Sequence, residues 1–405
     1  MIRTLLAALA LALPITASAA DDTQKPPPAA VVVAFDRESV TPLIAEGVRN
    51  FDSREPVAFN DPVRIASISK LIMALATLRL VDEGKIDLDA DVSDYLGFTV
   101  RSPNFPETPV TLAQLLSHRA GLRDKAGYII PLGASLEEKL ADPDAWYPQA
   151  PPGEAPFEYA NLGSPVVATA LEAATGERYD ALLERTVFGP LGVEACVNWV
   201  GCSDDMVVRA VALYRHTDEP ARDYPGDLPP ACSIPVAEGV ECTLEDYVPG
   251  TNASVFSPQG GVRIGMVDLA KIGQRVMQLK AGDFLQRKSI DRLIASAVTG
   301  QTDNQEFFCA YGFGLQMIDN PNWDCSDKLF GTGMIFFGHS GEAYGLQSGL
   351  WWGSDSETGY VYFQTQAPPP VGGEDTGGFS QGEKDLMKRA RKILAARQET
   401  GESGD

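Results

Sequence analysis

The order of apolar and polar positions predicts extended segments near both ends of the chain and helices between them. Residues 30–35 form a β-branched apolar run and residues 40–48 a second extended segment, which is typical of paired strands. The segment 67–81 is apolar on every side of a helix, so we expect a buried helix there, and Gly84 is placed to end it.

Helix and strand patterns continue through the rest of the chain. Thr111 and Gln114 form a capping-box pattern at the start of one helix, and Asn161 is placed to cap another that runs to Thr175. We further expect helices at 267–279, 289–297 and 383–397, and strands at 310–318, 334–338, 345–352 and 359–364. Strands at both ends of a helical middle predict an α+β fold whose sheet is built from both ends of the chain.

The first residues predict a secretory signal peptide. Arg3 precedes an apolar run from Leu5 to Leu13, and small residues follow where a signal peptidase cleaves. Because this run is too short to anchor the chain in a bilayer, we expect a periplasmic or secreted protein with no membrane span after signal removal. The expected organisation is a signal peptide at 1–19, a polar leader at 20–29, a single domain at 30–398 and a polar tail at 399–405.

Six cysteines agree with an oxidising compartment, in which disulfides form. Four of them lie in an irregular stretch, residues 196–255, which we interpret as an excursion from the domain. We predict pairing between neighbours, because each pair brackets a polar, turn-rich stretch: Cys196 with Cys202, Cys232 with Cys242, and Cys309 with Cys325. The three histidines lie far from these pairs, so we expect neither a metal site nor a cofactor.

The charge balance narrows the range of partners. Acidic residues outnumber basic residues by 55 to 33, which gives a formal net charge of −22. Such a surface repels nucleic acid and anionic lipid headgroups, so we expect neither as a partner. The expected partner is a small molecule or a short peptide, and the oligomeric state is left open.

Ser67 and Lys70 are the first candidates for catalysis. Residues three apart on a helix share a face, so the Lys70 amine can reach the Ser67 hydroxyl. Lys70 stands in the first turn of a helix that is otherwise apolar all round, and burial lowers the pKa of a lysine and makes it a plausible base. The alternative is a helix-capping serine followed by a surface lysine.

Two further motifs carry polar groups at the borders of expected elements. Tyr159 can act as a general acid or base near a cation, and Asn161 can orient a substrate amide. The run Gly338-His339-Ser340-Gly341 ends the expected strand 334–338, and the next amide, of Glu342, can complete an oxyanion hole with that of Ser67. Taken alone, each motif also fits a structural role.

In this order the three motifs resemble the serine β-lactamase and penicillin-binding superfamily, and within it the branch of class C enzymes, D-alanyl-D-alanine peptidases and related esterases. Further segments that are similar to that family are Leu115 to Leu122, Ser257-Pro258-Gln259-Gly260-Gly261 and Tyr311-Gly312-Phe313-Gly314. The resemblance implies a β-lactamase/transpeptidase-like antiparallel sheet flanked by helices, with an all-helical region and the site between them.

The resemblance also implies a role for each motif residue. Ser67 becomes the nucleophile that forms an acyl-enzyme, Lys70 and Tyr159 share the proton transfers, and Asn161 orients the substrate. Further implied site residues are His339, Ser340, Gly341 and Glu342, whereas we interpret His118 as structural. The third motif has histidine where efficient β-lactamases have lysine, and either Arg263 or Arg119 could supply the missing charge.

The predicted function is therefore a serine hydrolase that acts on esters, amides or D-amino-acid peptides. Two alternatives within the resemblance are a β-lactamase proper and a penicillin-binding protein that acylates without turnover and acts as a sensor. An α/β-hydrolase is excluded: Ser380 lies in a nucleophile-elbow pattern, but that class needs a histidine after the serine, and none follows His339.

Overall fold

The computed structural model describes residues 25–221, 232–278, 284–302, 307–367 and 378–400. The predicted signal peptide, the first part of the predicted leader and residues 401–405 lie outside the described residues.

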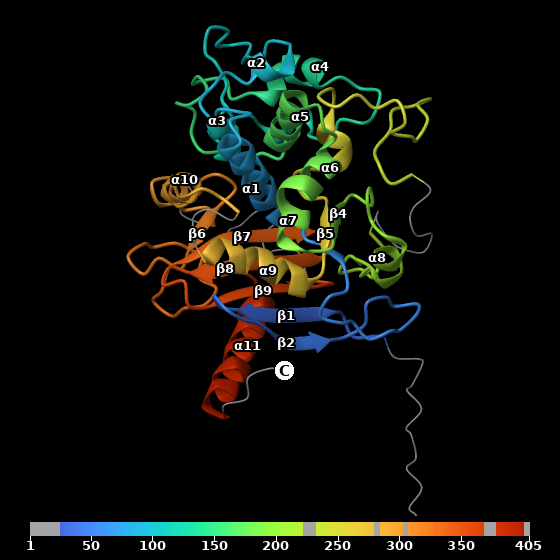
Figure 1. The fold of residues 1–405 in the computed structure, drawn as a ribbon, viewed down its shortest axis with the longest axis vertical. Coiled ribbons are helices and arrows are strands. Elements are labelled where there is room, and N and C mark those ends of the chain that lie inside the picture. Colours follow the sequence, from blue (N-terminus) through green and yellow to red (C-terminus); the bar gives the residue numbers. More distant parts are fainter. Residues whose placement is uncertain (1–24, 222–231, 279–283, 303–306, 368–377, 401–405) are drawn as a thin grey trace, which may run out of the picture.

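A six-stranded antiparallel sheet forms the base of the molecule and contains both ends of the domain (Figure 1). Its strand order is β2-β1-β9-β8-β7-β6. The strands are β1 (Ala30–Phe35), β2 (Val40–Glu46), β6 (Gln316–Ile318), β7 (Phe336–Ala343), β8 (Leu346–Gly353) and β9 (Gly359–Gln364). Because β1 pairs with β2 on one side and with β9 on the other, the predicted α+β sheet built from both chain ends is confirmed.

Helices cover both faces of this sheet. On one face lie α1 (Ile68–Asp82) and α9 (Met266–Met277), and on the other lies α11 (Gln381–Thr400). Alternate residues of β1 therefore enter different cores: Val31 and Val33 pack with the α1 and α9 side, Val32 and Ala34 with the α11 side. Burial on both faces explains why β1 is continuously apolar.

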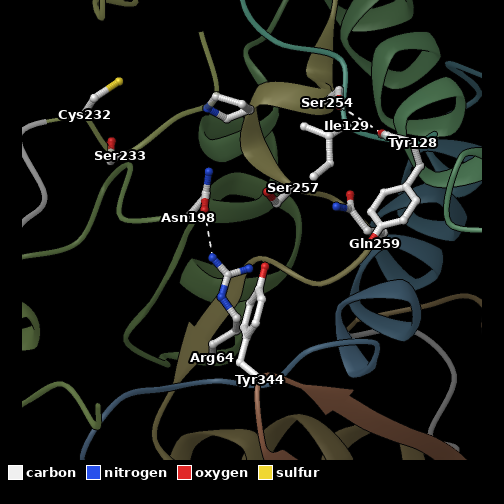
Figure 2. A pocket seen from close by; sticks show the side chains of 11 residues that line it. Arg64, Tyr128, Ile129, Asn198, Cys232, Ser233, Ser254, Ser257, Gln259 and Tyr344 are labelled. Atoms are coloured by element: carbon white, nitrogen blue, oxygen red, sulfur yellow. Dashed lines mark hydrogen bonds between the residues drawn. The ribbon is translucent and has the colours of Figure 1, made fainter. Parts of the chain in front are cut away.

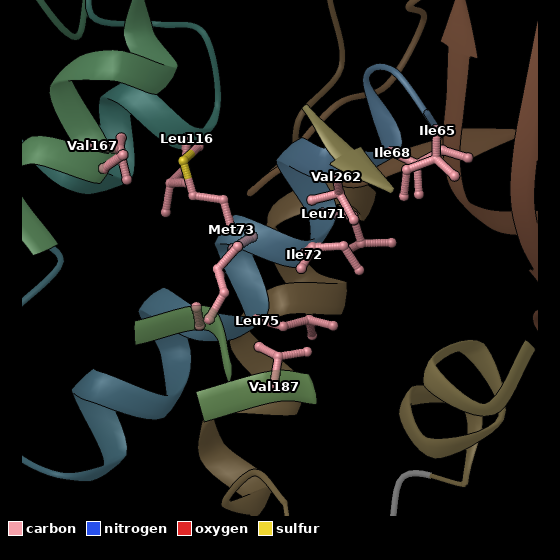
Figure 3. Packing of buried hydrophobic residues seen from close by; sticks show 14 of the residues in the cluster. Ile65, Ile68, Leu71, Ile72, Met73, Leu75, Leu116, Val167, Val187 and Val262 are labelled. Carbon is pink, nitrogen blue, oxygen red and sulfur yellow. The ribbon is translucent and has the colours of Figure 1, made fainter. Parts of the chain in front are cut away.

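An all-helical region lies above the sheet, at the top of Figure 1, and α1 connects the two (Figure 1). It contains α2 (Ser93–Leu96), α3 (Leu112–Leu116), α4 (Leu136–Ala141), α5 (Gly163–Thr175) and α6 (Tyr179–Leu183), with the short helices η1 (Asp124–Ala126), η2 (Pro143–Ala145), η3 (Glu184–Phe188) and α7 (Gly189–Leu191). Apolar side chains of α1 pack with Leu116, Val167 and Val187 of the helical region (Figure 3), and α1 also contacts β7 and β8 of the sheet. The prediction of a helix buried on every side is confirmed.

The remaining elements flank these two regions. They are a three-stranded sheet of β3 (Val63–Arg64), β5 (Val262–Ile264) and β4 (Ala195–Val197), and the helices α8 (Asp204–Arg209), η5 (Ala253–Phe256) and α10 (Arg287–Val298). The stretch 196–255, predicted to be irregular, contains part of β4, the helix α8 and part of η5 among its described residues. Within it, the Tyr247 hydroxyl and the Gly250 amide donate hydrogen bonds to buried Glu172 of α5, which tie the stretch to the helical region.

The described structure corrects several predicted boundaries. Asn161 does not cap α5, because Leu162 is the N-cap residue and Asn161 directs its side chain elsewhere. The predicted strand 310–318 is regular only at β6, where the partner strand β7 supplies hydrogen bonds. The final helix continues to Thr400, two residues into the predicted tail. Among the described residues, no helix has the length and apolar composition that a bilayer crossing requires.

The three disulfides join neighbouring cysteines as predicted: Cys196–Cys202, Cys232–Cys242 and Cys309–Cys325. Their loops differ in length, with sequence separations of 6, 10 and 16 residues. A longer closed loop removes more conformational entropy from the unfolded chain, so the last bridge is the most stabilising of the three in the chain-entropy model.

Removing the Cys309–Cys325 bridge by a double substitution to serine should lower the free energy of unfolding by about 3 kcal/mol. Removing the Cys196–Cys202 bridge in the same way should lower it by less, because that loop is shorter. Urea unfolding of the two variants measures this difference, after non-reducing peptide mass spectrometry has established the pairing in the parent protein. A larger loss on removing the short bridge would contradict the loop-length argument.

Candidate active site

Ser67 stands at the point where a strained turn enters α1. It is the N-cap residue of the helix, and the preceding residue, Ala66, has a left-handed backbone with φ of 48°. Such a conformation is costly for a residue other than glycine and persists only where the surroundings hold it. Gly341 of β7 helps to hold it, because a Cβ there would lie 2.3 Å from the Ile65 carbonyl oxygen. The turn and the strand are therefore packed directly against each other.

Lys70 is buried one turn into the helix, with 2% of its surface exposed. Its Nζ atom lies 3.1 Å from Ser67 Oγ, 2.8 Å from Asn161 Oδ1 and 3.0 Å from the Gln259 main-chain oxygen. A neutral amine has two N–H groups and one lone pair. If the N–H groups serve the two carbonyl-type oxygens, the lone pair is left for the Ser67 hydroxyl proton.

Burial lowers the pKa of Lys70 from 10.5 to about 7, although the negative charge of Asp124 opposes this shift. Desolvation disfavours the ammonium form, and the three hydrogen-bond contacts are with uncharged groups. A substantial fraction of Lys70 is therefore neutral near pH 7, as a general base requires.

Asp124 holds the loop that carries Asn161, a role that sequence reasoning missed. One carboxylate oxygen accepts hydrogen bonds from the Asn161 amide and from Asn161 Nδ2, both at 2.9 Å, and the other accepts one from the Leu162 amide. These bonds fix the orientation of the Asn161 carboxamide, so that its oxygen faces Lys70. Asn161 is thus positioned by η1 and not by a helix-capping bond.

Tyr159 lies in an aromatic cluster beside Lys70. The centre of its ring is 4.7 Å from Lys70 Nζ, it stacks on Phe308 at 4.5 Å, and it lies 4.4 Å from the His118 ring. Phe308 adjoins Cys309, and Tyr311, inside the loop closed by Cys309 and Cys325, has its ring centre 5.9 Å from that of Tyr159, so this disulfide loop also contributes to the cluster. His118 Nδ1 accepts a hydrogen bond from the Ala160 amide, which agrees with the structural interpretation of that histidine.

His339 is fully buried, and both of its ring nitrogens have partners inside the protein. Nδ1 lies 2.5 Å from the Ser340 carbonyl oxygen, which can only accept, so Nδ1 carries the proton; Nε2 then accepts from the Tyr311 hydroxyl at 2.9 Å. Burial and the nearby Lys70 charge lower the pKa of His339 to about 3. The ring is therefore neutral at physiological pH.

The third motif lies inside β7 and not at its end, which corrects the sequence prediction. Ser340 donates a hydrogen bond from its hydroxyl to Gln316 of β6. Gly341 contacts the turn before Ser67, and Glu342 follows it in the same strand, paired with Gln347 of β8. The strand thus brings the Glu342 backbone near the start of α1.

A small pocket with a volume of about 80 Å³ opens beside this cluster (Figure 2). It is lined by Arg64, Tyr128, Ile129, Asn198, Cys232, Ser233, Pro235, Ser254, Ser257, Gln259 and Tyr344. Gln259 belongs to both the catalytic cluster and the pocket, because its main-chain oxygen contacts Lys70 and its side chain lines the pocket. Cys232 and Ser233 show that the cysteine-rich stretch forms part of the wall.

Among the described residues that line this pocket, Arg64 is the cation, and sequence reasoning did not single it out. The two arginines considered from the sequence are engaged elsewhere: the Arg263 guanidinium lies 3.7 Å over the Trp199 ring, and Arg119 donates to the Gln301 carbonyl oxygen. Among the described residues, a single grouping has the composition of a metal site, namely Cys309, Cys325 and Asp327. Two of its three members are joined in a disulfide, which removes the thiolates that a metal would need.

Comparison with known proteins agrees with this geometry. The family model described as Beta-lactamase matches residues 16–379. The chain is 31% identical over 208 residues to Esterase EstB of Burkholderia gladioli, covering 48% of this chain and 51% of the esterase. It is also 31% identical over 140 residues to the D-alanyl-D-alanine-carboxypeptidase/endopeptidase AmpH of Escherichia coli (strain K12). This match covers 33% of this chain and 35% of AmpH. The chain therefore matches about half or less of the length of these relatives.

A solved structure extends the similarity over nearly the whole chain. The D-amino acid amidase of Ochrobactrum anthropi SV3 superimposes with a TM-score of 0.64, covering 91% of this chain and 94% of the amidase. At 18% sequence identity, this likeness shows the fold alone.

The contacts of Asp124 generate a prediction about Lys70. In Asp124→Asn the charge that raises the lysine pKa is lost, so the pH midpoint for labelling Ser67 with a fluorophosphonate probe should move to lower pH. The plateau rate should fall by about tenfold, because Asn161 loses a charged hydrogen-bond acceptor. Asp144→Asn, at an exposed ion pair nearby, is the matched control and should change neither value. A midpoint that moves to higher pH would contradict this account.

Proposed function

The chain belongs to the Beta-lactamase family, and we propose that it is a serine hydrolase that cleaves esters, amides or D-amino-acid peptides through an acyl-enzyme on Ser67. The observation that carries the proposal is the buried Lys70 amine, with its pKa lowered to about 7, 3.1 Å from the Ser67 hydroxyl. The names of the relatives, an esterase and a carboxypeptidase, supply the substrate classes.

In the proposed acylation step, Ser67 Oγ attacks the substrate carbonyl carbon and Lys70 takes the hydroxyl proton. The resulting oxyanion is stabilised by the amides of Ser67 and Glu342 at the junction of α1 and β7. The bond to the leaving oxygen or nitrogen then breaks, and that atom receives the proton through Lys70 and Tyr159. Asn161, held by Asp124, orients the substrate.

Deacylation reverses these roles with water as the nucleophile. Water attacks the acyl carbon, its proton passes to the same basic groups, and Ser67 recovers its proton as the acid product leaves. The alternative of a sensor that acylates without turnover differs from this proposal only in the second step.

We also infer that the protein acts outside the cytoplasm. Support comes from the apolar N-terminal run of the sequence and from three disulfides, which persist in oxidising compartments.

Ser67→Ala should lower kcat by on the order of 10⁴ or more on any substrate that the enzyme cleaves. The measurement is a panel of short-chain esters, D-Ala-D-Ala peptides, D- and L-aminoacyl amides and a chromogenic cephalosporin. Ser380→Ala serves as the control, since Ser380 contacts Gln347 and Glu383 at the start of α11. Activity that survives in Ser67→Ala and disappears in Ser380→Ala would refute the assignment.

For a neutral ester, kcat/KM should rise with pH through an apparent pKa of about 7, because the base form of Lys70 is the active one. Initial-rate assays between pH 5 and 9 measure this dependence of kcat/KM on pH. A rate that falls as pH rises through 7 would be inconsistent with Lys70 as the base.

Because His339 is neutral, a carboxylate on the leaving group meets no lysine cation at this position of β7. We expect butyrylglycolamide to be cleaved several-fold to tens of times faster than butyryl glycolate, since a neutral hydrogen bond is weaker than a charge-assisted one by about 1 kcal/mol or somewhat more. The preference should persist at pH 6 and pH 8, both above the His339 pKa of about 3. His339→Lys should reduce the preference for butyrylglycolamide over butyryl glycolate. Equal rates for these two esters at pH 8 in the parent enzyme would contradict this prediction.

A further inference from the structure

We propose that Asn198 is a positioning residue for Lys70, because it holds the segment 255–261 where the Gln259 main-chain oxygen meets the lysine amine. The proposal rests on the hydrolase function inferred above, in which Lys70 activates Ser67. Asn198 acts through other residues and stands in the turn that follows β4.

The Lys70 amine needs two acceptors if it is to face Ser67 as a base. In the neutral form, one N–H group donates to Asn161 Oδ1 at 2.8 Å and the other to the Gln259 main-chain oxygen at 3.0 Å. The two bonds fix the rotation about the terminal C–N bond, so that the lone pair points at Ser67 Oγ. Asp124 holds the first acceptor, and the second acceptor needs an equivalent support.

Asn198 supplies this support by joining the two ends of the segment. Its main-chain N–H donates to the Gly261 carbonyl oxygen at 2.8 Å, and its side-chain Nδ2 donates to the Val255 carbonyl oxygen at 3.1 Å. Gln259 lies between these two anchor points, after Ser257, which has a left-handed backbone with φ of 51°. The segment therefore turns back on itself, and Asn198 closes the turn.

A second connection runs through Arg64. The Asn198 side-chain oxygen accepts a hydrogen bond from Arg64 at 2.8 Å (Figure 2), and the same guanidinium donates to the Gly260 carbonyl oxygen at 3.0 Å. Gly260 directly follows Gln259 in the chain. Asn198 is buried, so its side-chain bonds are shielded from water. Both polar atoms of its carboxamide thus contribute to holding the segment.

The turn that carries Asn198 is strained and is held by its surroundings. Asn198 and Trp199 have successive left-handed backbones, with φ of 48° and 71°. Asparagine tolerates this conformation, whereas a bulky residue adopts it rarely, and such strain persists where the structure around it holds it and gathers at functional sites. The Cys196–Cys202 disulfide closes this turn, and the Arg263 guanidinium lies over the Trp199 ring. The Asn198 side chain therefore extends from a fixed backbone.

The test replaces Asn198 by glycine. Glycine accepts the left-handed backbone and keeps the main-chain bond to Gly261, while both side-chain connections are lost. The readout is the rate of Ser67 labelling by a fluorophosphonate probe as a function of pH. Its fluoride leaving group needs no proton, so the rate reports on how Lys70 activates the serine. In Asn198→Gly the plateau rate should fall by about tenfold, because the lone pair is no longer held toward Ser67.

The pH midpoint of labelling should also move to lower pH in Asn198→Gly. A carbonyl oxygen that accepts from the ammonium ion stabilises the charged form, so a less closely held Gln259 oxygen lowers the pKa of Lys70. A purely structural loss would lower stability without moving this midpoint. The groups around the amine that carry charge or titrate are the same in the parent and the variant: Asp124, His118, His339 and Tyr159.

Two further variants sharpen the test. Asn198→Asp keeps an acceptor for Arg64 but has no donor for Val255, so its plateau rate should lie between those of the parent and Asn198→Gly. Asp218→Gly is the matched control, because it also replaces a left-handed residue, with φ of 69°, by glycine, at an exposed ion pair with Lys25. It should keep the parent plateau and midpoint. Urea unfolding establishes that each variant is folded under the assay conditions.

A plateau and a midpoint in Asn198→Gly that equal those of the parent, or an equal loss in Asp218→Gly, would overturn the role of Asn198 while Ser67-dependent labelling remains. If Asn198→Gly did not fold, a parent-like plateau in Asn198→Asp would overturn it in the same way. If the parent showed no labelling that Ser67→Ala abolishes, the positioning role and the proposed function would fail together.

Discussion

The arrangement of this site depends on one constraint, the burial of the Lys70 amine next to Ser67 without a carboxylate in direct contact. Its hydrogen-bond partners are a hydroxyl, a carboxamide oxygen and a main-chain carbonyl oxygen. A carboxylate in place of Asn161 would stabilise the ammonium ion and raise its pKa. Asp124 instead lies behind Asn161, with Asn161 between it and Lys70. There it orients the Asn161 carboxamide, and its negative charge opposes the lowering of the Lys70 pKa by burial.

The two buried histidines follow from the same constraint. Burial lowers the pKa of both His118 and His339, and the charge of Lys70 lowers each further. Both rings therefore stay neutral and can pack among Tyr159 and Tyr311 as aromatic groups. With both rings neutral, the Lys70 amine, whose pKa is about 7, changes charge near neutral pH.

The sequence predicted those features that are encoded locally. Residues 30–35 and 67–81 have apolar patterns that depend on burial alone, and both the strand and the helix are present. Ser67 and Lys70 were found because three residues of helix bring their side chains together. The polar residues His339 and Ser340 led us to end the strand too early, because pairing with β8, and not apolarity, determines how far β7 continues.

Residues that act through long-range contacts could not be found in this way. Asp124 reaches Asn161 across 37 positions, and Gln259 reaches Lys70 across 189. Arg64 stands only three residues before Ser67, yet its role depends on Asn198, which is 134 positions away. The local sequence around Asp124 and Arg64 has no feature that distinguishes them from other polar residues, whereas Gln259 lies in the segment Ser257 to Gly261, which resembles the family but does not reveal the contact with Lys70. Their importance follows from which backbone oxygen or carboxamide the fold places beside them.

The same strand that supports Ser67 also separates two electrostatic environments. At the His339 end of β7, burial keeps the histidine neutral, and the surrounding side chains are aromatic. At the Tyr344 end, the pocket contains a buried guanidinium among hydroxyl and amide groups. In a chain with a formal net charge of −22, a pocket whose described lining has no acid is a local departure from the overall charge.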